Sequence, residues 1–261
     1  MLYQYCANTD PGRARENNED SVVFDAATHT MVLADGMGGY NAGEIASGMA
    51  TAFIKSELSR WLAEAGHGAN TKEVRRAMEI CVGNANLSIY NAANSNAHYA
   101  GMGTTLVVGV FLGDTLLVGH IGDSRCYRLR EGVLEQITKD HSLLQEQIDA
   151  GLITLAQAAN SSIKNLVTRA LGVEGQVVLE VHEHTVLPGD VYMMCSDGLS
   201  DMVSDPAIAK IVSLDAELEV VAEELIAVAN ANGGRDNISV LLAVAAESAE
   251  KRGLIARLLG K

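Results

Sequence analysis

Cysteine, proline and long apolar runs are scarce or missing in this sequence. Its 261 residues include four cysteines, none spaced as C-x-x-C, and only three prolines. No zinc ribbon or thioredoxin-like motif is therefore predicted, and the cysteines are expected to be buried thiols in a reducing compartment. No stretch of 18 apolar residues predicts a membrane span, and residues 1–13 lack the basic and apolar pattern of a signal peptide. We therefore expect a cytoplasmic protein.

Basic residues are also few. Lysine and arginine number 19 against 33 aspartates and glutamates, which gives a formal net charge of −14. This excess of negative charge repels nucleic acid and anionic membrane surfaces, so neither is expected as a partner, and a nuclease is disfavoured. Two interpretations of the acidic excess stay open. It is an ordinary soluble surface, or part of it is a carboxylate cluster that bound cations neutralise.

The low proline content leaves no proline-, serine- or glycine-rich linker, so we predict one domain over residues 1–246 and a short tail over 247–261. Asn70 and Glu73 have the spacing of a capping box at the start of a helix. Pairs of helices between clusters of strands are typical of an α+β fold with two sheets packed face to face. Hydrophobic periodicity and turn residues predict strands over 21–24, 31–34, 177–186, 191–195 and 238–244, helices over about 42–64, 71–97, 141–150, 206–213 and 216–231, and an antiparallel meander over 104–138.

The tail combines apolar and basic residues. Leu254, Ile255, Leu258 and Leu259 fall on one face of a helix, with lysines and arginines between them. A helix that binds a membrane surface or a partner fits this pattern. A docked or frayed terminal helix fits it as well.

Five acidic segments share one design, in which an aspartate stands beside an apolar, strand-like run. They contain Asp20, Asp35, Asp123, Asp197 and Asp236. Aspartates at strand ends can meet in one cleft, where they repel each other unless cations compensate their charge. Sites made only of oxygen ligands suit Mg²⁺ or Mn²⁺. A single Asp-Gly is more often a turn, but five such segments together predict a metal site.

Eight motifs in sequence order carry a resemblance to a known family. They are GRARENNEDS, VLADGMGG, GMGTT, HIGDSRCYRLR, TKDHS, NLVTRALG, CSDGLSD and GRDNISV, and they extend from about Asp10 to Val244. This set resembles the type 2C (PPM) family of metal-dependent serine/threonine protein phosphatases in its compact bacterial form. The resemblance implies a four-layer α/β/β/α sandwich, with two antiparallel sheets flanked by helix pairs. It also implies a centre of two Mn²⁺ or Mg²⁺ ions in a cleft at one edge of the sheets.

The resemblance also assigns roles to single residues. Asp35 matches the carboxylate that bridges both metals, and the backbone carbonyl of Gly36 matches a ligand of one of them. Asp197 and Asp236 match the ligands of the metal on that side, with Asn237 adjoining them. All of these residues lie beside strand-like runs.

The remaining matches concern the second metal and the substrate. Asp20, with Glu19 beside it, matches the acidic pair that binds the waters around the other metal. Asp123 is similar to the residue that, with Asp197, holds a third and weaker metal in bacterial members. Arg15 matches the arginine that grips the substrate phosphate, because its planar fork can bind two phosphoryl oxygens. A surface salt bridge with a neighbouring glutamate is its alternative role.

Two departures from the family pattern affect the prediction. Met37 stands where some members carry a histidine assigned as general acid, so a metal-bound water is expected to protonate the leaving group. His141 is a second candidate acid, but a hydrogen-bonded structural role is favoured for it. The segment 141–171 is similar to the family's flap beside the active site. Its run 161–165 lacks the His-Pro that bacterial relatives often carry, which leaves the substrate preference open.

The resemblance finally implies an activity. A hydroxide shared by the two metals would attack phosphoserine or phosphothreonine on proteins, without a phosphoenzyme. The partners implied are phosphorylated proteins, including a serine/threonine kinase or its substrates, and a monomer is expected. The alternative is a catalytically weak binding protein of the same fold.

Overall fold

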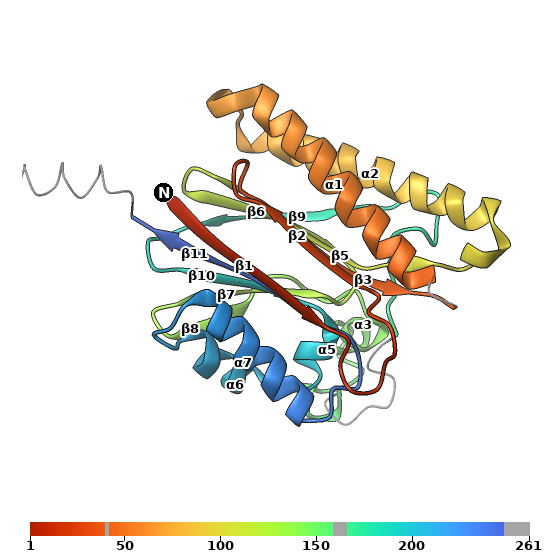
Figure 1. Ribbon diagram of the computed structural model, residues 1–261. Helices are drawn as coiled ribbons and strands as arrows, with labels where there is room; N and C mark the ends of the chain where they lie inside the picture. Colours follow the sequence, from red (N-terminus) through yellow and green to blue (C-terminus); the bar gives the residue numbers. More distant parts are fainter. Residues whose placement is uncertain (40–41, 159–165, 248–261) are drawn as a thin grey trace, which may run out of the picture.

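The computed structural model describes residues 1–39, 42–158 and 166–247. Two antiparallel β-sheets pack face to face, and helices cover both outer faces (Figure 1). The expected four layers are therefore confirmed. The first sheet has the order β1 (Leu2–Asp10), β11 (Ile238–Ala246), β10 (Val191–Cys195), β7 (Arg125–Arg130) and β8 (Val133–Gln136). The second has the order β2 (Asp20–Asp25), β3 (Thr30–Met37), β5 (Leu106–Leu112), β6 (Thr115–Ile121) and β9 (Glu180–Thr185), and β4 (Gly103–Thr104) pairs with β3.

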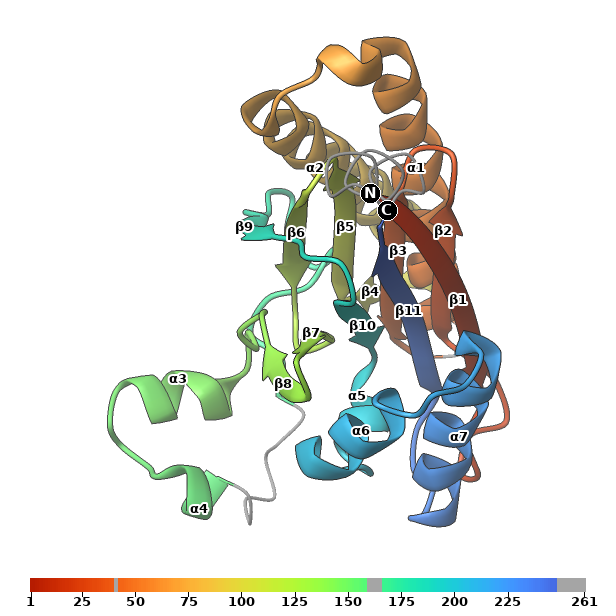
Figure 2. The same cartoon turned by 90° about the vertical axis from the view of Figure 1, so that its left-hand side faces the viewer.

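The helices form two groups outside the sheets. Two long helices, α1 (Ala42–Ala65) and α2 (Thr71–Ser95), cover the second sheet, while α6 (Asp205–Val212) and α7 (Leu218–Ala231) cover the first (Figure 1). Short 3₁₀ turns follow α1 (Gly66–Gly68) and α2 (Ala97–Tyr99). The one-turn helix α5 (Asp197–Ser200) follows β10, and α3 (Leu143–Asp149) and α4 (Leu155–Ala158) project from the sandwich below β7 and β8 (Figure 2).

Helix α2 begins as the sequence predicts. The Asn70 side chain accepts hydrogen bonds from the backbone N–H groups of Lys72 and Glu73, at 3.0 and 3.1 Å. The Glu73 carboxylate accepts in return from the Asn70 N–H, at 3.0 Å. This capping box satisfies N–H groups that have no partner inside the helix.

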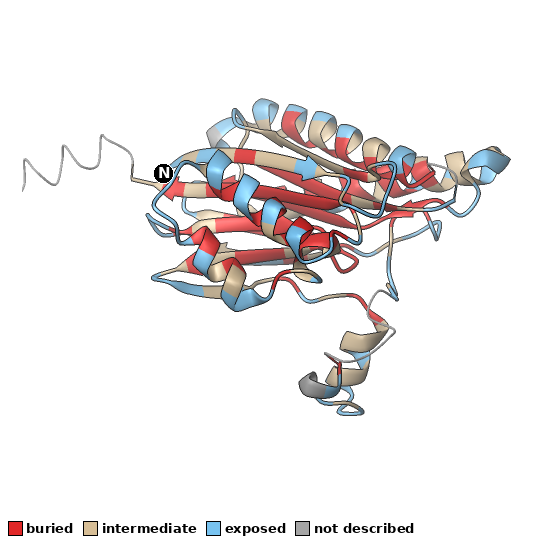
Figure 3. Ribbon diagram, turned by 60° about the horizontal axis from the view of Figure 1, so that its bottom comes forward, coloured by how far each residue is buried: buried red, intermediate tan, exposed pale blue. Residues whose placement is uncertain are grey.

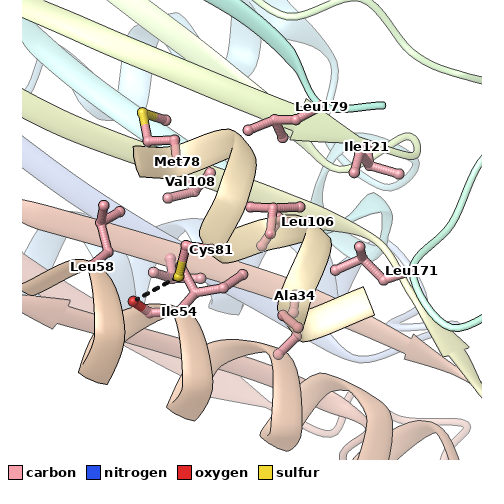
Figure 4. Packing of buried hydrophobic residues seen from close by; sticks show 14 of the residues in the cluster. Ala34, Ile54, Leu58, Met78, Cys81, Leu106, Val108, Ile121, Leu171 and Leu179 are labelled. Atoms are coloured by element: carbon pink, nitrogen blue, oxygen red, sulfur yellow. Dashed lines mark hydrogen bonds between the residues drawn. The ribbon is translucent and has the colours of Figure 1, made fainter. Parts of the chain in front are cut away.

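Three hydrophobic layers hold the four structural layers together. One lies between the second sheet and α1 and α2, where Ile54, Leu58 and Met78 are fully buried (Figure 4). One lies between the two sheets, and one between the first sheet and α6 and α7. Buried residues accordingly follow the strands and one face of each covering helix (Figure 3). Each large aliphatic side chain buried in this way stabilises the fold by about 1.5–3 kcal/mol.

The predicted meander over 104–138 is wrong in one respect. Strands β5 and β6 pair in the second sheet, whereas β7 and β8 pair in the first. The chain crosses between the sheets at Gly122, whose φ of +103° is a backbone conformation that favours glycine. A Cβ atom there would lie 2.7 Å from the side chain of Thr105. The local pattern of strands and turns does not distinguish such a crossing from a hairpin.

The buried cysteines were predicted correctly, whereas the first strand of the fold was not predicted. All four cysteines are buried and free, as predicted. Strand β1 was not predicted, although it pairs along its whole length with β11. Strand β11 lies inside its sheet, between β1 and β10. Within the described ranges, no helix has both the length and the apolarity needed to cross a bilayer. The tail lies outside the described residues, apart from Glu247.

Candidate active site

The predicted aspartates lie in strands of the second sheet or next to strands of either sheet. Asp20 opens β2, and Asp35 lies opposite it in β3 of the same sheet. Asp197 starts α5 directly after β10, and Asp236 stands two residues before β11. Asp123 follows the crossing at Gly122. The cluster therefore depends on how the two sheets pack, and not only on neighbouring strands.

The carboxylate of Asp20 connects the two sheets. Its Oδ2 accepts a hydrogen bond of 2.7 Å from Oγ of Ser196, which lies between β10 and α5. Ser196 Oγ also accepts from the Ser239 N–H on β11, at 3.0 Å. The other oxygen of Asp20, Oδ1, is buried and has no hydrogen-bond partner among the described residues. Burying an unpaired carboxylate oxygen is costly, so this atom is suited to a cation that the protein binds.

The electrostatics show that the carboxylates interact. Removal from solvent, followed by the charges of Asp20, Asp197, Asp123 and Asp236, raises the pKa of Asp35 well above its ordinary value. Removal from solvent likewise raises the pKa of Asp197, with Asp123 as the next cause. Burial raises the pKa values of Asp20 and Asp123 to about 6. These groups cannot all be charged at neutral pH without compensating positive charge.

The backbone around Gly36 leaves no room for a side chain. Its N–H donates to the Glu19 carbonyl at 3.1 Å. A Cβ atom at Gly36 would lie 2.2 Å from the Gly43 carbonyl oxygen, at the start of α1. Glycine is therefore required where β3 passes between the loop before β2 and the first turn of α1.

Asn237 fixes the loop that carries the predicted phosphate-binding arginine. Its Oδ1 accepts from the Glu19 N–H at 2.7 Å. Its Nδ2 donates to the carbonyls of Pro11 and Asn17, at 3.0 and 2.9 Å. Asn237 itself is buried, while its partners Pro11 and Asn17 are exposed, so the three hydrogen bonds are partly buried. They tie residues 11–19 to the entry of β11.

Arg15 contacts the acidic cluster directly. Its guanidinium donates to Oδ2 of Asp236 at 2.7 Å, while about half of the side chain (54%) stays exposed. The hydrogen bond to Asp236 raises the pKa of Arg15 above its ordinary value. The observed partner is thus a predicted metal ligand, and not the neighbouring Glu16 or Glu19 of the alternative role.

A cavity of about 320 Å³ adjoins the cluster. Asp123 and Asp197 line it together with Asp140, Asp201 and Asp205. Further residues around it come from β7, from α3 and from the turn before α3. The aspartates Asp140, Asp201 and Asp205 were not identified from the sequence, because each lies outside the recurring strand-aspartate pattern.

His141 is held by hydrogen bonds, as favoured from the sequence. Its Nδ1 accepts from the Gly122 N–H at 3.2 Å, and its Nε2 lies 3.1 Å from Oε2 of Glu180. Both ring nitrogens are therefore committed within the protein. His141 is not among the residues that line the acidic cavity.

Comparisons with known proteins agree with this geometry. The family described as Protein phosphatase 2C matches residues 13–242. Serine/threonine phosphatase stp of Listeria monocytogenes is 36% identical over 237 residues, which are 90% of this chain and 92% of that protein. The crystal structure of serine/threonine phosphatase PstP/Ppp from Mycobacterium tuberculosis has a TM-score of 0.87 and 36% identity, covering 95% of this chain and 100% of that one. The crystal structure of the catalytic domain of PstP in complex with two manganese ions has a TM-score of 0.82 and 37% identity. The match covers 94% of this chain and 99% of that one.

Proposed function

This chain belongs to the protein phosphatase 2C family and is a metal-dependent serine/threonine protein phosphatase, and we propose that its five clustered aspartates hold the catalytic cations. The observation that carries the proposal is the buried Oδ1 of Asp20, which no described residue contacts by a hydrogen bond and which lies among carboxylates that raise each other's pKa values. Such a group of oxygen donors is suited to hard divalent cations.

The proposed ligand set follows from the cluster. Asp35 is central, because it interacts with the other four carboxylates. Asp20 holds one ion through its waters, while Asp197, Asp236 and the Gly36 carbonyl hold the other. Mn²⁺ and Mg²⁺ both suit these donors, and a relative's structure contains two manganese ions. Such ions activate water for attack and neutralise charge on the phosphoryl oxygens.

A third and weaker cation is proposed in the acidic cavity. Asp123 and Asp197 both line that cavity, and Asp123 is the second largest cause of the raised pKa of Asp197. Because both carboxylates line the same cavity, we propose that they share one ion there.

Arg15 is proposed to exchange partners during substrate binding. Its guanidinium is held by Asp236 at the rim of the cluster, and about half of it is exposed. When cations neutralise Asp236, Arg15 can turn its two-pronged donor face to the substrate phosphate.

The proton for the leaving serine or threonine oxygen is proposed to come from water in the site. Met37 has no proton to donate. His141 is committed to Gly122 and Glu180. No side chain that the sequence offers as an acid is therefore free to act as one.

The proposed substrates are phosphorylated proteins, including a serine/threonine kinase or its targets, and the proposed state is a cytoplasmic monomer. The decisive test is hydrolysis of a phosphothreonine peptide by the metal-free protein with and without Mn²⁺ or Mg²⁺. Turnover that depends on the added ion supports the proposal, and full activity in EDTA refutes it. Phosphoproteomics of a strain that lacks the protein would then identify the physiological substrates.

A further inference from the structure

A second cluster of titratable side chains lies outside the aspartate site. It contains His120 on β6, His141 before α3 and Glu180 on β9, whose potential ligand atoms lie within 4.8 Å of one another. His120 and Glu180 are directly opposite each other in the β6–β9 ladder. The spacing raises the question of whether the cluster binds a metal.

Hydrogen bonds determine where the protons of these histidines lie. The Lys139 carbonyl can only accept, so Nε2 of His120, at 2.7 Å, carries a proton. The Gly122 N–H can only donate, so Nδ1 of His141, at 3.2 Å, presents a lone pair. The proton of neutral His141 is then on Nε2, where it faces the Glu180 carboxylate at 3.1 Å.

A metal ligand needs a lone pair directed at the ion, and Nε2 of His141 has none in this arrangement. The guanidinium of Arg169 lies 3.4 Å from the same nitrogen, farther away than Glu180. Glu180, His141 and Gly122 therefore form a chain of hydrogen bonds on which the ring of His120 stacks, and His141 offers no lone pair to an ion.

Glu180 defines one end of this chain. Partial burial raises its pKa, but hydrogen bonds from His182 and His141 outweigh that effect and lower the pKa to about 2. Its Oε1 is 2.8 Å from Nε2 of His182, and its Oε2 faces His141. An ionised carboxylate only accepts hydrogen bonds, so it selects the form of His141 with the proton on Nε2.

The other end of the chain reaches the proposed metal site. Gly122 forms two hydrogen bonds with His141. Its N–H donates to Nδ1 of the His141 ring, and its carbonyl accepts from the His141 backbone N–H at 2.9 Å. Gly122 has a positive φ and directly precedes Asp123. The orientation of the Asp123 carboxylate therefore depends on a turn at Gly122 whose N–H and carbonyl are both hydrogen-bonded to His141.

The same residue anchors the flap. The Thr168 N–H donates to the His141 carbonyl at 2.8 Å, and the Leu143 N–H donates to the Leu166 carbonyl at 2.9 Å. The ring of His120 stacks on that of His141, with centroids 4.6 Å apart and planes 16° apart. His141, at the start of the flap, thus joins the turn before Asp123 to Thr168 near the end of the flap.

We propose that His141 and Glu180 are positioning residues of the phosphatase: Glu180 sets the proton position on His141, and His141 sets the turn that presents Asp123 to the third cation. This inference rests on the proposed function, because it takes Asp123 as a cation ligand. Neither residue needs to touch the substrate or the metals.

Substitution of His141 tests the link to the metal. His141→Leu removes the acceptor for the Gly122 N–H, whereas His141→Asn can supply an amide oxygen near the position of Nδ1. We expect His141→Leu to raise the Mn²⁺ concentration for half-maximal activity by about tenfold, as for other partners of metal ligands. His141→Asn should restore it to within about threefold of wild type. His98→Leu, at an exposed histidine, is the matched control. Equal metal dependence of the Leu and wild-type proteins would overturn the proposal.

The proton position is measured independently of activity. In the wild type, ¹⁵N NMR should show His141 protonated on Nε2 and unprotonated on Nδ1. Glu180→Leu should shift the population toward the other form, and Glu180→Gln should largely retain it. A protonated Nδ1 in the wild type would contradict the inference even if His141→Leu fails to fold. A second contradicting result would come from adding Zn²⁺ to an Asp123→Asn protein. A change in the ¹⁵N shifts of His120 and His141 would show that these histidines bind a metal.

These measurements separate the two proposals. If the phosphatase is inactive with every cation while the ¹⁵N signals are as expected, the proposed metal chemistry fails and the hydrogen-bond chain stands. If the wild type shows cation-dependent turnover but His141→Leu has unchanged metal dependence, the positioning role alone fails.

Discussion

Asp20 and Asp35 are directly opposite each other in the β2–β3 ladder. Side chains of such a pair project from the same face of the sheet, with Cβ atoms about 4.5–5.5 Å apart. Two like charges in this position destabilise the sheet. The chain nevertheless adds three further aspartates around them. The five clustered aspartates therefore destabilise the metal-free protein at the place where cations are proposed to bind.

Replacing the central carboxylate should separate stability from activity. We expect Asp35→Asn to lower kcat by at least about tenfold, because a proposed cation ligand is lost. The same change removes one charge from a repelling cluster, so the melting temperature of the protein in EDTA should rise. Phosphopeptide kinetics and thermal unfolding in EDTA test both parts. Retention of most of the activity would refute the assignment of Asp35.

The stabilising contribution of Asp20 and Asp123 in the metal-free protein should fall as the pH rises. Folding raises the pKa values of Asp20 and Asp123 to about 6, from about 3.9 for an ordinary aspartate. Between these values each of the two carboxyl groups binds more protons in the folded state than in the unfolded state, so its contribution to the free energy of unfolding falls with increasing pH. The total loss between pH 4.5 and 6.5 is on the order of a few kcal/mol.

Urea unfolding in EDTA across this pH range measures the effect. Saturating Mn²⁺ should flatten the dependence near neutral pH, because the ions replace the protons as compensating charge. If an Asp20→Asn, Asp123→Asn protein kept the pH dependence of the wild type in EDTA, the two carboxylates would not contribute as described.

Removal of the phosphate-binding arginine should affect mainly KM. Arg15→Ala takes away a contact that is present in both the ground state and the transition state, so we expect kcat to change little. Arg15→Lys should restore KM only in part, because an ammonium group cannot form the paired hydrogen bonds of a guanidinium. Arg13→Ala, at an exposed arginine in the same loop, is the control. A lowered kcat with an unchanged KM would contradict the role of Arg15.

Loss of the Asn237 side chain should loosen the loop that carries Arg15. Asn237→Ala removes the side chain that accepts from the Glu19 N–H and donates to the carbonyls of Pro11 and Asn17. We expect the free energy of unfolding to fall by about 1–3 kcal/mol, with a lower kcat/KM. Asn94→Ala, on the exposed face of α2, should cost less than about 0.5 kcal/mol. Equal effects of the two changes in urea unfolding would argue against this role.

Much of this arrangement could be predicted from local patterns. Apolar periodicity located the long helices, the Asn70–Glu73 spacing predicted a capping box, and the recurring strand-aspartate pattern pointed to one acidic cluster. Strand β1 was missed because its residues are mostly half-buried and polar residues interrupt it. The crossing at Gly122 was missed because it depends on which sheet receives the next strand.

Partners that lie far apart in the chain were also beyond local patterns. Arg15 and Asp236 are 221 residues apart, and Asp20 and Ser196 are 176 apart. No local pattern assigns a role to His120 or Glu180. Their relationship to His141 depends on the β6–β9 register, which only the folded chain reveals.

The place of β11 inside its sheet has a consequence for biosynthesis. Asp236 and Asn237 stand just before this strand, and both β1 and β10 pair with it in the sheet. A nascent chain that stops short of Asp236 lacks both the strand and two residues of the site. Premature termination before Asp236 is therefore expected to yield inactive fragments.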